Sequence, residues 1–279
     1  MRDLEPDIIK SSGEKVKFSF SKLRRSLLKS GANESIVSSI IDEIRDELYQ
    51  GISTKELYNR AFALLKDHKG AYASRYRLKK AIYELGPSGF PFEKFVAEIL
   101  KFAGYEVELN KILQGECVTH EVDIIAKKGG TGHLIECKFH SEEGRNCDVK
   151  IPLYINSRFN DIHSFEKKEN QGWLVTNTRF TLDALTYGEC VGLKLLSWDY
   201  PEEESLKVLI DNSGAYPITT STLLSDSEKQ FLLEKGIILG RNLLERSYLL
   251  DHQGISENRK KRILSELSIL CDISVNDGE

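Results

Sequence analysis

Cysteine pairs, a basic charge excess and long apolar runs are all missing from this 279-residue chain. Its five cysteines are scattered and include no Cys-x-x-Cys pair, so neither a zinc ribbon nor a dithiol redox site is expected. The formal net charge is -4, and 29% of the residues are charged. Without a global basic field, any affinity for nucleic acid must come from local patches.

Segments that would direct the chain into or across a membrane are also missing. No stretch approaches 18 consecutive apolar residues, and the first 15 residues have no apolar core of signal-peptide length. We therefore expect a cytoplasmic protein with no membrane partner. The sequence also contains no Gly-x-x-x-x-Gly-Lys loop, so any bound ATP is expected to act as a signal that need not be hydrolysed.

The hydrophobic pattern divides the chain into three parts and predicts a multidomain α/β fold. Residues 1–86 read as a two-strand hairpin followed by four helices, the last of them over residues 72–83. Residues 87–214 read as helix, three strands, helix and strand, which predicts a mixed sheet, and a further helix is expected from Pro201. Residues 215–279 read as a small helical module.

The stretch "HEVDIIAKKGGTGHLIECKFH", residues 120–140, places acids and a base in two apolar runs. Because side chains alternate along a strand, Glu136 and Lys138 share one face of the second run. The glycine-rich turn between the runs predicts a hairpin, which brings Asp123 next to Glu136.

Two adjacent carboxylates raise one another's pKa unless a cation neutralises them. A hard divalent ion such as Mg²⁺, held by Asp123, Glu136 and water, meets that need. Lys138 is then placed to position a water for attack on phosphorus and to offset the charge that develops. The alternative is a solvated strand face, which is the commonest reason for a lone Glu-x-Lys.

These residues, together with "FEKFVAEILKFAGYEVE" and "GWLVTNTRFTLDA", resemble the Mrr-like branch of the restriction-endonuclease superfamily over about residues 88–200. The resemblance implies an αβββαβ fold in which Asp123 and Glu136 bind Mg²⁺ or Mn²⁺ and Lys138 is the catalytic lysine. It also implies that Glu93 on the first helix is an auxiliary acid, with an exposed helix carboxylate as the alternative. Some branches have Gln in place of Glu136, so the glutamate is a permitted variant.

Further polar residues flank this pattern. Arg158 and His163 follow it on a predicted helix and are candidates for phosphate contact, with a solvated helix as the alternative. His120 and His133 are candidates for substrate contact, but we interpret both as structural.

The N-terminal segments "IIKSSGEKVKFSFSKLRRSLL", "GISTKEL" and "YASRYRL" resemble an ATP-cone over about residues 5–86. The resemblance implies ATP or dATP as a regulatory ligand, with Lys10 and Lys22 on its phosphates and Thr54 near the base or ribose. The alternatives are two surface lysines and a helix-start residue. The sequence departs from the family at Ser11 and Ser12, where Arg-Asp is usual.

The segment "LLERSYLLDHQGISENRKKRILSEL" resembles a helix-hairpin-helix unit with its turn at residues 254–256 and basic residues at 259–262. A helical interaction or dimerisation module is the alternative. A second basic run, residues 66–80, is interleaved with tyrosines and predicts contact with DNA or a nucleotide, unless it is a solvated helix face.

Together the patterns favour a metal-dependent DNA endonuclease with a nucleotide-binding domain. The domains are then an ATP-cone at 1–86, an Mrr-like endonuclease at 87–214 and the helical module at 215–279. The expected partners are DNA, a nucleotide and a second copy of the chain. The alternatives are a nucleotide-responsive DNA-binding regulator that does not cut, and a nuclease specific for junctions or RNA. The intact acid pair favours an enzyme over a regulator.

Overall fold

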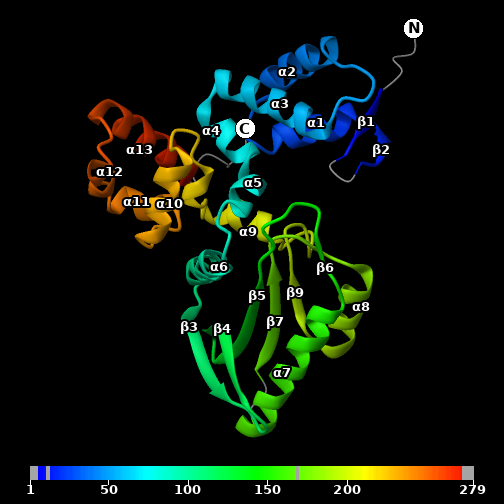
Figure 1. Cartoon of the computed structure of the whole chain (residues 1–279), viewed down its shortest axis with the longest axis vertical. Coiled ribbons are helices and arrows are strands. Elements are labelled where there is room, and N and C mark those ends of the chain that lie inside the picture. Colours follow the sequence, from blue (N-terminus) through cyan, green and yellow to red (C-terminus); the bar gives the residue numbers. More distant parts are fainter. Residues whose placement is uncertain (1–5, 11–12, 168–169, 272–279) are drawn as a thin grey trace.

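The computed structural model describes residues 6–10, 13–167 and 170–271. Helices from the two ends of the chain lie together in one half of an elongated molecule, and the main sheet lies in the other half (Figure 1). None of the helices within the described ranges combines the length and the apolar composition that a bilayer crossing requires.

The N-terminal part is a short hairpin followed by helices with side-chain N-caps. Ser19, Asn33 and Ser53 each accept a hydrogen bond from a backbone N–H in the first turn of the helix that follows. Apolar stripes on the helices, including the fully buried Leu27 and Ile40, form a core of their own. The elements are β1 Asp7–Ile9, β2 Lys15–Lys17, α1 Phe20–Leu28, α2 Glu34–Asp46, α3 Thr54–His68, α4 Gly70–Tyr76 and α5 Leu78–Tyr83.

The single helix predicted over residues 72–83 is wrong, because α4 and α5 are separate and meet at Arg77. The buried Arg77 guanidinium donates hydrogen bonds to the carbonyl oxygens of Thr219 and Ser221 and forms an ion pair with Glu84. We attribute the break to the two carbonyl contacts, whose partners lie about 140 residues away and leave no trace in local periodicity.

The middle part has the predicted order of helix, three strands, helix and strand, with additional short elements. The main sheet has the order β3-β4-β5-β7-β9, in which β3, β4 and β5 pair antiparallel while β5, β7 and β9 pair parallel. A small parallel pair, β6 and β8, lies beside it. The elements are α6 Phe90–Phe102, β3 Glu106–Gln114, β4 Thr119–Lys128, β5 Thr131–Lys138, β6 Asn146–Cys147, α7 Lys150–Glu166, β7 Gln171–Thr176, β8 Arg179–Phe180, α8 Leu182–Val191 and β9 Lys194–Leu196.

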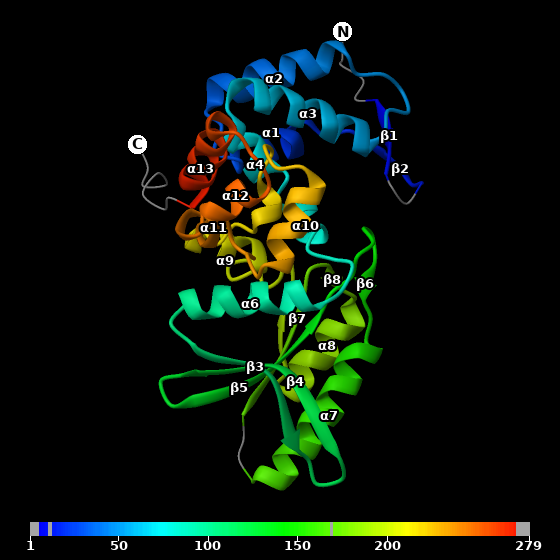
Figure 2. The same cartoon turned by 60° about the vertical axis from the view of Figure 1, so that its left-hand side comes forward.

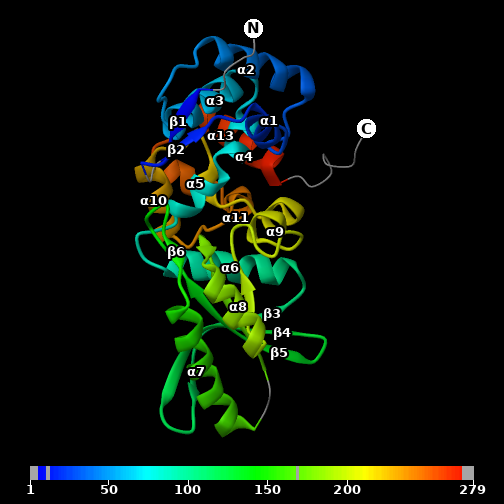
Figure 3. The ribbon, with the colours of Figure 1, turned by 90° about the vertical axis from the view of Figure 1, so that its right-hand side faces the viewer.

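Helices cover both faces of the main sheet. The α6 helix runs across one face, between the sheet and the C-terminal helices (Figure 2). Its Phe92 and Phe95 pack in one core with Ile135 of β5. The α7 and α8 helices lie against the other face (Figure 3), where Leu134 and Phe159 belong to a second core. Because neighbouring residues of β5 enter different cores, the strand that carries the predicted site is held from both sides.

The chain after β9 is helical, but the helix predicted from Pro201 begins later than expected. Residues 202–204 form a turn, and α9 begins after Ser205, whose hydroxyl accepts a hydrogen bond from the Val208 N–H. A capping box at Ser225 and Glu228 begins α10, as the Ser-x-x-Glu spacing predicts. The elements are α9 Leu206–Ser213, a 3-10 turn Ile218–Thr220, α10 Asp226–Glu234, α11 Gly240–Glu245, α12 Tyr248–His252 and α13 Glu257–Cys271.

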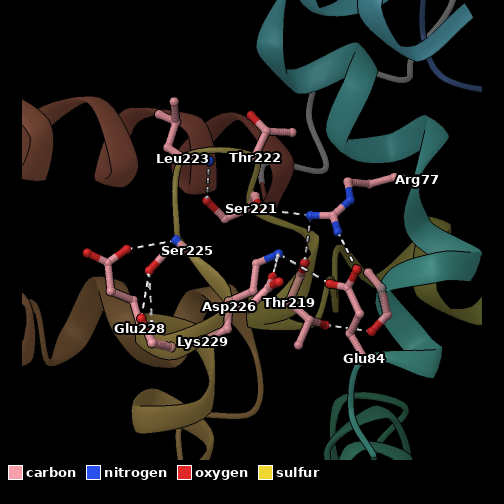
Figure 4. A network of polar contacts seen from close by, with 12 residues as sticks. Arg77, Glu84, Thr219, Ser221, Thr222, Leu223, Ser225, Asp226, Glu228 and Lys229 are labelled. Carbon is pink, nitrogen blue, oxygen red and sulfur yellow. Dashed lines mark hydrogen bonds and ion pairs between the residues drawn. The ribbon is translucent and has the colours of Figure 1, made fainter. Parts of the chain in front are cut away.

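Polar contacts bind this C-terminal part to α4 and α5 of the N-terminal part. Figure 4 shows Arg77 and Lys229 both reaching Glu84. The N–O distances of these two ion pairs are 2.6 and 3.2 Å. Nearby, the buried Glu266 carboxylate of α13 accepts hydrogen bonds from the hydroxyl of Ser74 on α4 and from the backbone and hydroxyl of Thr222. Residues of α4, α5, α6, the sheet and the C-terminal helices also share one apolar core. The three parts are therefore packed as one body.

Candidate active site

Asp123 and Glu136 lie side by side where β4 and β5 separate. The antiparallel ladder between these strands ends with Ile124 opposite Ile135. One further step in the same register places Asp123 opposite Glu136. Beyond that point β5 continues its parallel pairing with β7, and the Cys137 N–H donates to Asp123 Oδ2 at 2.8 Å. The Asp123 side chain therefore accepts a hydrogen bond from the backbone of β5 just beyond the end of the β4–β5 ladder.

Glu136 is a largely buried carboxylate with one unpaired oxygen. Its side chain is 18% exposed, and its Oε1 lies 2.8 Å from Nη1 of Arg158. Its buried Oε2 has no hydrogen-bond partner among the described residues. Burial first, and then the charge of Asp123, raise the pKa of Glu136 to about 7, although Arg158 opposes the shift.

Asp123 and Glu93 are two further acids, close enough to Glu136 for their charges to raise its pKa. Burial raises the pKa of Asp123, against the opposing effects of the Cys137 N–H and of Arg158. Glu93 lies in the first turn of α6 and is half-buried, and its pKa is raised by burial and then by the charge of Asp123. Asn110 donates a hydrogen bond to its Oε2 at 3.4 Å. Glu93 thus lies near the acid pair and is half-buried, in contrast to the alternative of an exposed helix carboxylate.

Lys138 is the last residue of β5, two positions beyond Glu136 and opposite Thr176 of β7. Among the described residues, neither a hydrogen bond nor an ion pair engages its ammonium group. Its charge reaches His140, whose pKa is lowered by burial and then by Lys138. The strand therefore presents an acid and a base in the order predicted from the alternation of side chains.

The donor set at this site fits a hard cation. Asp123 and Glu136 offer carboxylate oxygens, and the unpaired buried Oε2 of Glu136 lacks the partner that a buried polar atom normally has. Within the described ranges, no three His, Cys, Asp or Glu side chains are grouped as a complete metal site. A cation held here would take its other ligands from water or substrate, as Mg²⁺ commonly does in proteins.

Arg158 is a site residue whose position the sequence did not predict. It lies on α7, forms an ion pair with Glu136, donates to the backbone carbonyl of Glu121 and lies over the ring of Tyr154. Its side chain is 13% exposed, so the alternative of a solvated helix is wrong at this position. The apolar spacing of Ile155 and Phe159 gave a usable signal, because it marks α7 as a helix packed against the sheet.

The three histidines considered from the sequence lie outside the acid group. His120 Nε2 is 2.7 Å from Asp161 Oδ2, and this contact is the main cause that lowers the pKa of Asp161 to about 2. His133 is buried and packs near Trp173 with ring centroids 5.1 Å apart. His163 lines a separate cavity beside α7. Their contacts are those of structural side chains.

The predicted nucleotide contacts are only partly brought together. A backbone bridge between Ile9 and Ser53 places the end of β1 beside the start of α3, so Lys10 and Thr54 belong to neighbouring segments. Thr54 lines a cavity of about 620 Å³, while Lys10 forms an ion pair with Glu14 at 2.8 Å. Lys22 is exposed in the first turn of α1. Ser11 and Ser12, where the sequence departs from the ATP-cone pattern, lie outside the described residues.

The C-terminal glycine turn is present, but two of the four basic residues at 259–262 form ion pairs within the protein. Gly254 has φ +66° between α12 and α13. Arg259 forms an ion pair with Glu228 at 2.5 Å, and Lys260 forms one with Asp251 at 2.7 Å. Residues 261 and 262 instead line a cleft of about 450 Å³ together with residues 66 and 69 of the basic run.

Comparison with protein families gives three matches in order along the chain. Residues 6–84 match the ATP cone domain, residues 86–200 match the restriction endonuclease domain of the Mrr type, and residues 216–271 match the C-terminal domain of AF1548-like proteins. The first two matches confirm both resemblances that the sequence motifs indicated. The chain is thus a nuclease-type protein with an ATP cone at its front.

Known proteins similar to this chain include an uncharacterized protein from Archaeoglobus fulgidus, with 34% identity over 174 residues that cover 61% of this chain and 97% of that protein. The crystal structure of AF1548, a protein of unknown function, has 31% identity and a TM-score of 0.55 over 66% of this chain and 98% of that one. A repair endonuclease from Pyrococcus abyssi, with 17% identity over 39% of this chain and 46% of that one, reaches a TM-score of 0.32 and adds no support. Because the first relative is matched over nearly its whole length, the chain belongs to the AF1548-like family, here with an ATP cone followed by a restriction endonuclease domain.

Proposed function

We propose that this protein is a metal-dependent DNA endonuclease whose activity responds to ATP or dATP bound by its ATP cone. The observation that carries the proposal is the Glu136 carboxylate. It is largely buried beside Asp123, keeps one oxygen unpaired, and is followed two residues later by a lysine without a partner among the described residues. A restriction endonuclease domain surrounds it.

The energetic cost of this arrangement supports a functional role. A carboxylate whose pKa is raised to about 7 destabilises the fold when it is ionised at neutral pH. Strongly perturbed acids of this kind concentrate at functional sites, because burial and like charges are arranged there for chemistry. A protein that only gripped DNA would gain stability by replacing Glu136 with a neutral side chain.

Each side chain has a distinct task in the proposed reaction. Asp123 and Glu136 would hold a divalent cation, which would supply Lewis-acid stabilisation of the phosphate and activation of water. Lys138 donates hydrogen bonds to the attacking water or to the phosphate oxygens and offsets their growing negative charge. Glu93 lies close enough to Asp123 for the Asp123 charge to raise the pKa of Glu93, and it orients water on that side. Arg158 fixes one oxygen of Glu136 and leaves the other free.

The bond that breaks is a phosphodiester P–O bond, and the resemblance to Mrr-like enzymes implies 5'-phosphate and 3'-hydroxyl products. The negative charge of DNA requires local cations, which the exposed basic residues of the cleft at positions 66, 69, 261 and 262 provide. DNA as the substrate, in preference to RNA, belongs to this proposal.

The ATP cone is proposed to bind nucleotide without hydrolysing it. Thr54 lines the cavity at the start of α3, and the end of β1 with Lys10 lies beside it. Lys22 in the first turn of α1 supplies a further cation. The nucleotide then acts as a regulatory ligand, and its effect on cleavage measures the coupling between the two sites.

The test is DNA cleavage by the full chain and two matched variants. Plasmid and linear DNA are incubated with Mg²⁺ or Mn²⁺, with and without ATP or dATP. Asp123→Asn is expected to reduce cleavage by about 10³-fold or more. Asp183→Asn, which makes the same change at an exposed position on α8, is expected to stay within about twofold.

The outcomes separate the enzyme from its alternatives. Cleavage that persists in Asp123→Asn contradicts the proposed site. If wild type and variant both bind DNA and neither cuts it with any metal or nucleotide, the protein is a DNA-binding regulator. Cleavage restricted to branched DNA or to RNA identifies a structure-specific nuclease with the same catalytic residues.

A further inference from the structure

A cavity of about 620 Å³ lies where the ATP cone meets the loop that leaves the catalytic strand. One wall comes from the start of α3 and a second from α5, both in the N-terminal part. The third wall is formed by Glu143 and Gly144, in the connection between β5 and β6. Figure 1 shows this green connection rising from the sheet toward the cone. Lys138 ends β5 only five residues before Glu143.

The lining chemistry suits a nucleoside polyphosphate. Tyr58 and Tyr83 supply aromatic surface, and the Tyr58 hydroxyl is buried without a hydrogen-bond partner among the described residues. Three lysines supply positive charge, namely Lys55, Lys79 and Lys80. The volume falls within the roughly 300–1,000 Å³ that small-molecule sites occupy. An aromatic half and a cationic half match a base and its phosphates.

Glu143 is the one acid among the residues that line this cavity. Among the described residues, no ion pair within 4 Å joins Glu143 to a lysine. Its charge therefore acts on the other walls across the cavity and not through direct contact. Burial, followed by the charge of Arg179, lowers the pKa of Lys79, and Glu143 is among the groups that oppose this shift. Glu143 therefore helps to keep Lys79 charged.

The loop that carries Glu143 is anchored at both ends and exposed between them. At one end, Asn177 exchanges two hydrogen bonds with the backbone of His140, at 2.9 and 2.8 Å. At the other end, Asn146 and Cys147 pair with β8. Residues 141–145 are all exposed. Displacement can therefore be confined to these five residues, which begin three positions beyond the proposed catalytic lysine.

We propose that Glu143 couples the nucleotide to the nuclease. This inference rests on the proposed function, because it names the route by which the same cone acts on the same active site. Without nucleotide, Glu143 is the one negative charge among the lining residues and opposes the positive charge of the cavity lysines. Bound phosphates take over that role, repel Glu143 and displace residues 141–145 from the cavity wall. Nucleotide binding and loop position then share one coupling free energy, which acts equally in both directions.

The test compares two neighbouring glutamates in the full chain. Glu143→Gln removes the acid that lines the cavity. Glu142→Gln makes the same change at a residue that does not line it and whose ion pair with Arg145 is exposed. Fluorescent ATP is titrated into each protein, and thermal melting confirms that each is folded. Glu143→Gln is expected to bind about two- to tenfold more tightly than wild type at low salt, because a repulsive charge is removed. Glu142→Gln is expected to stay within about twofold.

A second measurement addresses the coupling itself. The ratio of DNA cleavage with and without nucleotide is expected to move toward one in Glu143→Gln and to stay at the wild-type value in Glu142→Gln. If wild type binds ATP and both variants match it in affinity and in this ratio, the role of Glu143 is refuted while the nucleotide-binding cone stands. If wild type binds neither ATP nor dATP, the regulatory part of the proposed function fails as well, and cleavage without nucleotide still tests the nuclease.

Discussion

Replacing Arg158 with Met is expected to destabilise the protein by an amount that grows as the pH rises above 7. The guanidinium lies 2.8 Å from Glu136 Oε1, and the two side chains are only 13% and 18% exposed. Met keeps most of the apolar stem and removes the charge and its hydrogen bonds. Glu136 is then left beside Asp123 without its cation.

The direction follows from the pKa of Glu136, which is about 7 in the folded protein against an ordinary value of 4.5. Because the folded state holds this proton more tightly, wild type loses stability as the pH rises from 4.5 to about 7 and loses no more above it. Removing Arg158 raises the pKa of Glu136 further. The unfolding free energy of the variant therefore continues to fall above pH 7, by at most about 1.4 kcal/mol per pH unit.

The expected cost of Arg158→Met is about 1 kcal/mol near pH 6.5, where Glu136 is mostly protonated and lost hydrogen bonding dominates. It rises to about 2–3 kcal/mol near pH 8.5, where a buried acid must ionise without its partner. Urea denaturation in the presence of EDTA at several pH values measures the difference in unfolding free energy.

Arg179→Met is the matched control, because its ion pair with Asp199 has side chains that are 64% and 41% exposed. This variant is expected to lie within about 0.5 kcal/mol of wild type at every pH. A cost for Arg158→Met that does not change between pH 6.5 and 8.5 would refute the reasoning, because Arg158 would then act through packing alone.

Three further predictions concern stability and catalysis. Glu136→Gln is expected, in EDTA, to gain about 1–3 kcal/mol relative to wild type between pH 5 and 8, measured by urea denaturation. Gly86→Ala places a methyl group 2.7 Å from a ring carbon of Phe139, the neighbour of Lys138, and is expected to cost about 1–3 kcal/mol and lower kcat. Glu266→Leu leaves several buried donors unpaired and is expected to cost about 3–5 kcal/mol, whereas Glu266→Gln, which keeps an acceptor, costs about 1 kcal/mol by thermal melting.

Matched variants also separate these effects from general damage. Glu106→Gln changes an exposed charge on β3 and is expected to show no pH-dependent gain. Gly70→Ala adds a methyl group that meets no atom within 4 Å, so it is expected to be neutral. Equal melting temperatures for the two Glu266 variants would contradict the role of its carboxylate as an acceptor.

The order of elements in the endonuclease domain could be predicted because each is recorded in local periodicity. Alternation in β5 placed Glu136 and Lys138 on one face, and the length of the glycine-rich turn predicted the hairpin with Asp123. Family resemblance contributed roles that periodicity cannot provide. The proposed catalytic residues Asp123, Glu136 and Lys138 lie within about 20 residues of sequence, so their arrangement could be predicted from that stretch alone.

What could not be predicted depends on contacts between distant segments. Arg158 reaches Glu136 from a helix whose docking is set by the core beneath it. Arg77 divides α4 from α5 through carbonyl groups in the C-terminal part. The cavity wall at Glu143 likewise exists only when the cone and the endonuclease domain are packed together. The local spacing of apolar and polar residues cannot predict such contacts, because neither partner departs from the pattern of its own segment.

The contacts between the cone and the C-terminal helices also constrain how the chain folds during its synthesis. Ser74 and Arg77 leave the ribosome early, but their partners Glu266, Thr219 and Ser221 are made about 140–190 residues later. At about 5–20 residues per second, α4 and α5 wait on the order of 10–40 seconds with an apolar face uncovered. The α1–α3 bundle, to whose core α4 adds Ala73, shares no core with the C-terminal helices within the described ranges and can form during this interval. We therefore expect the nucleotide cavity, which α5 helps to line, to be completed only after the last helix has been made.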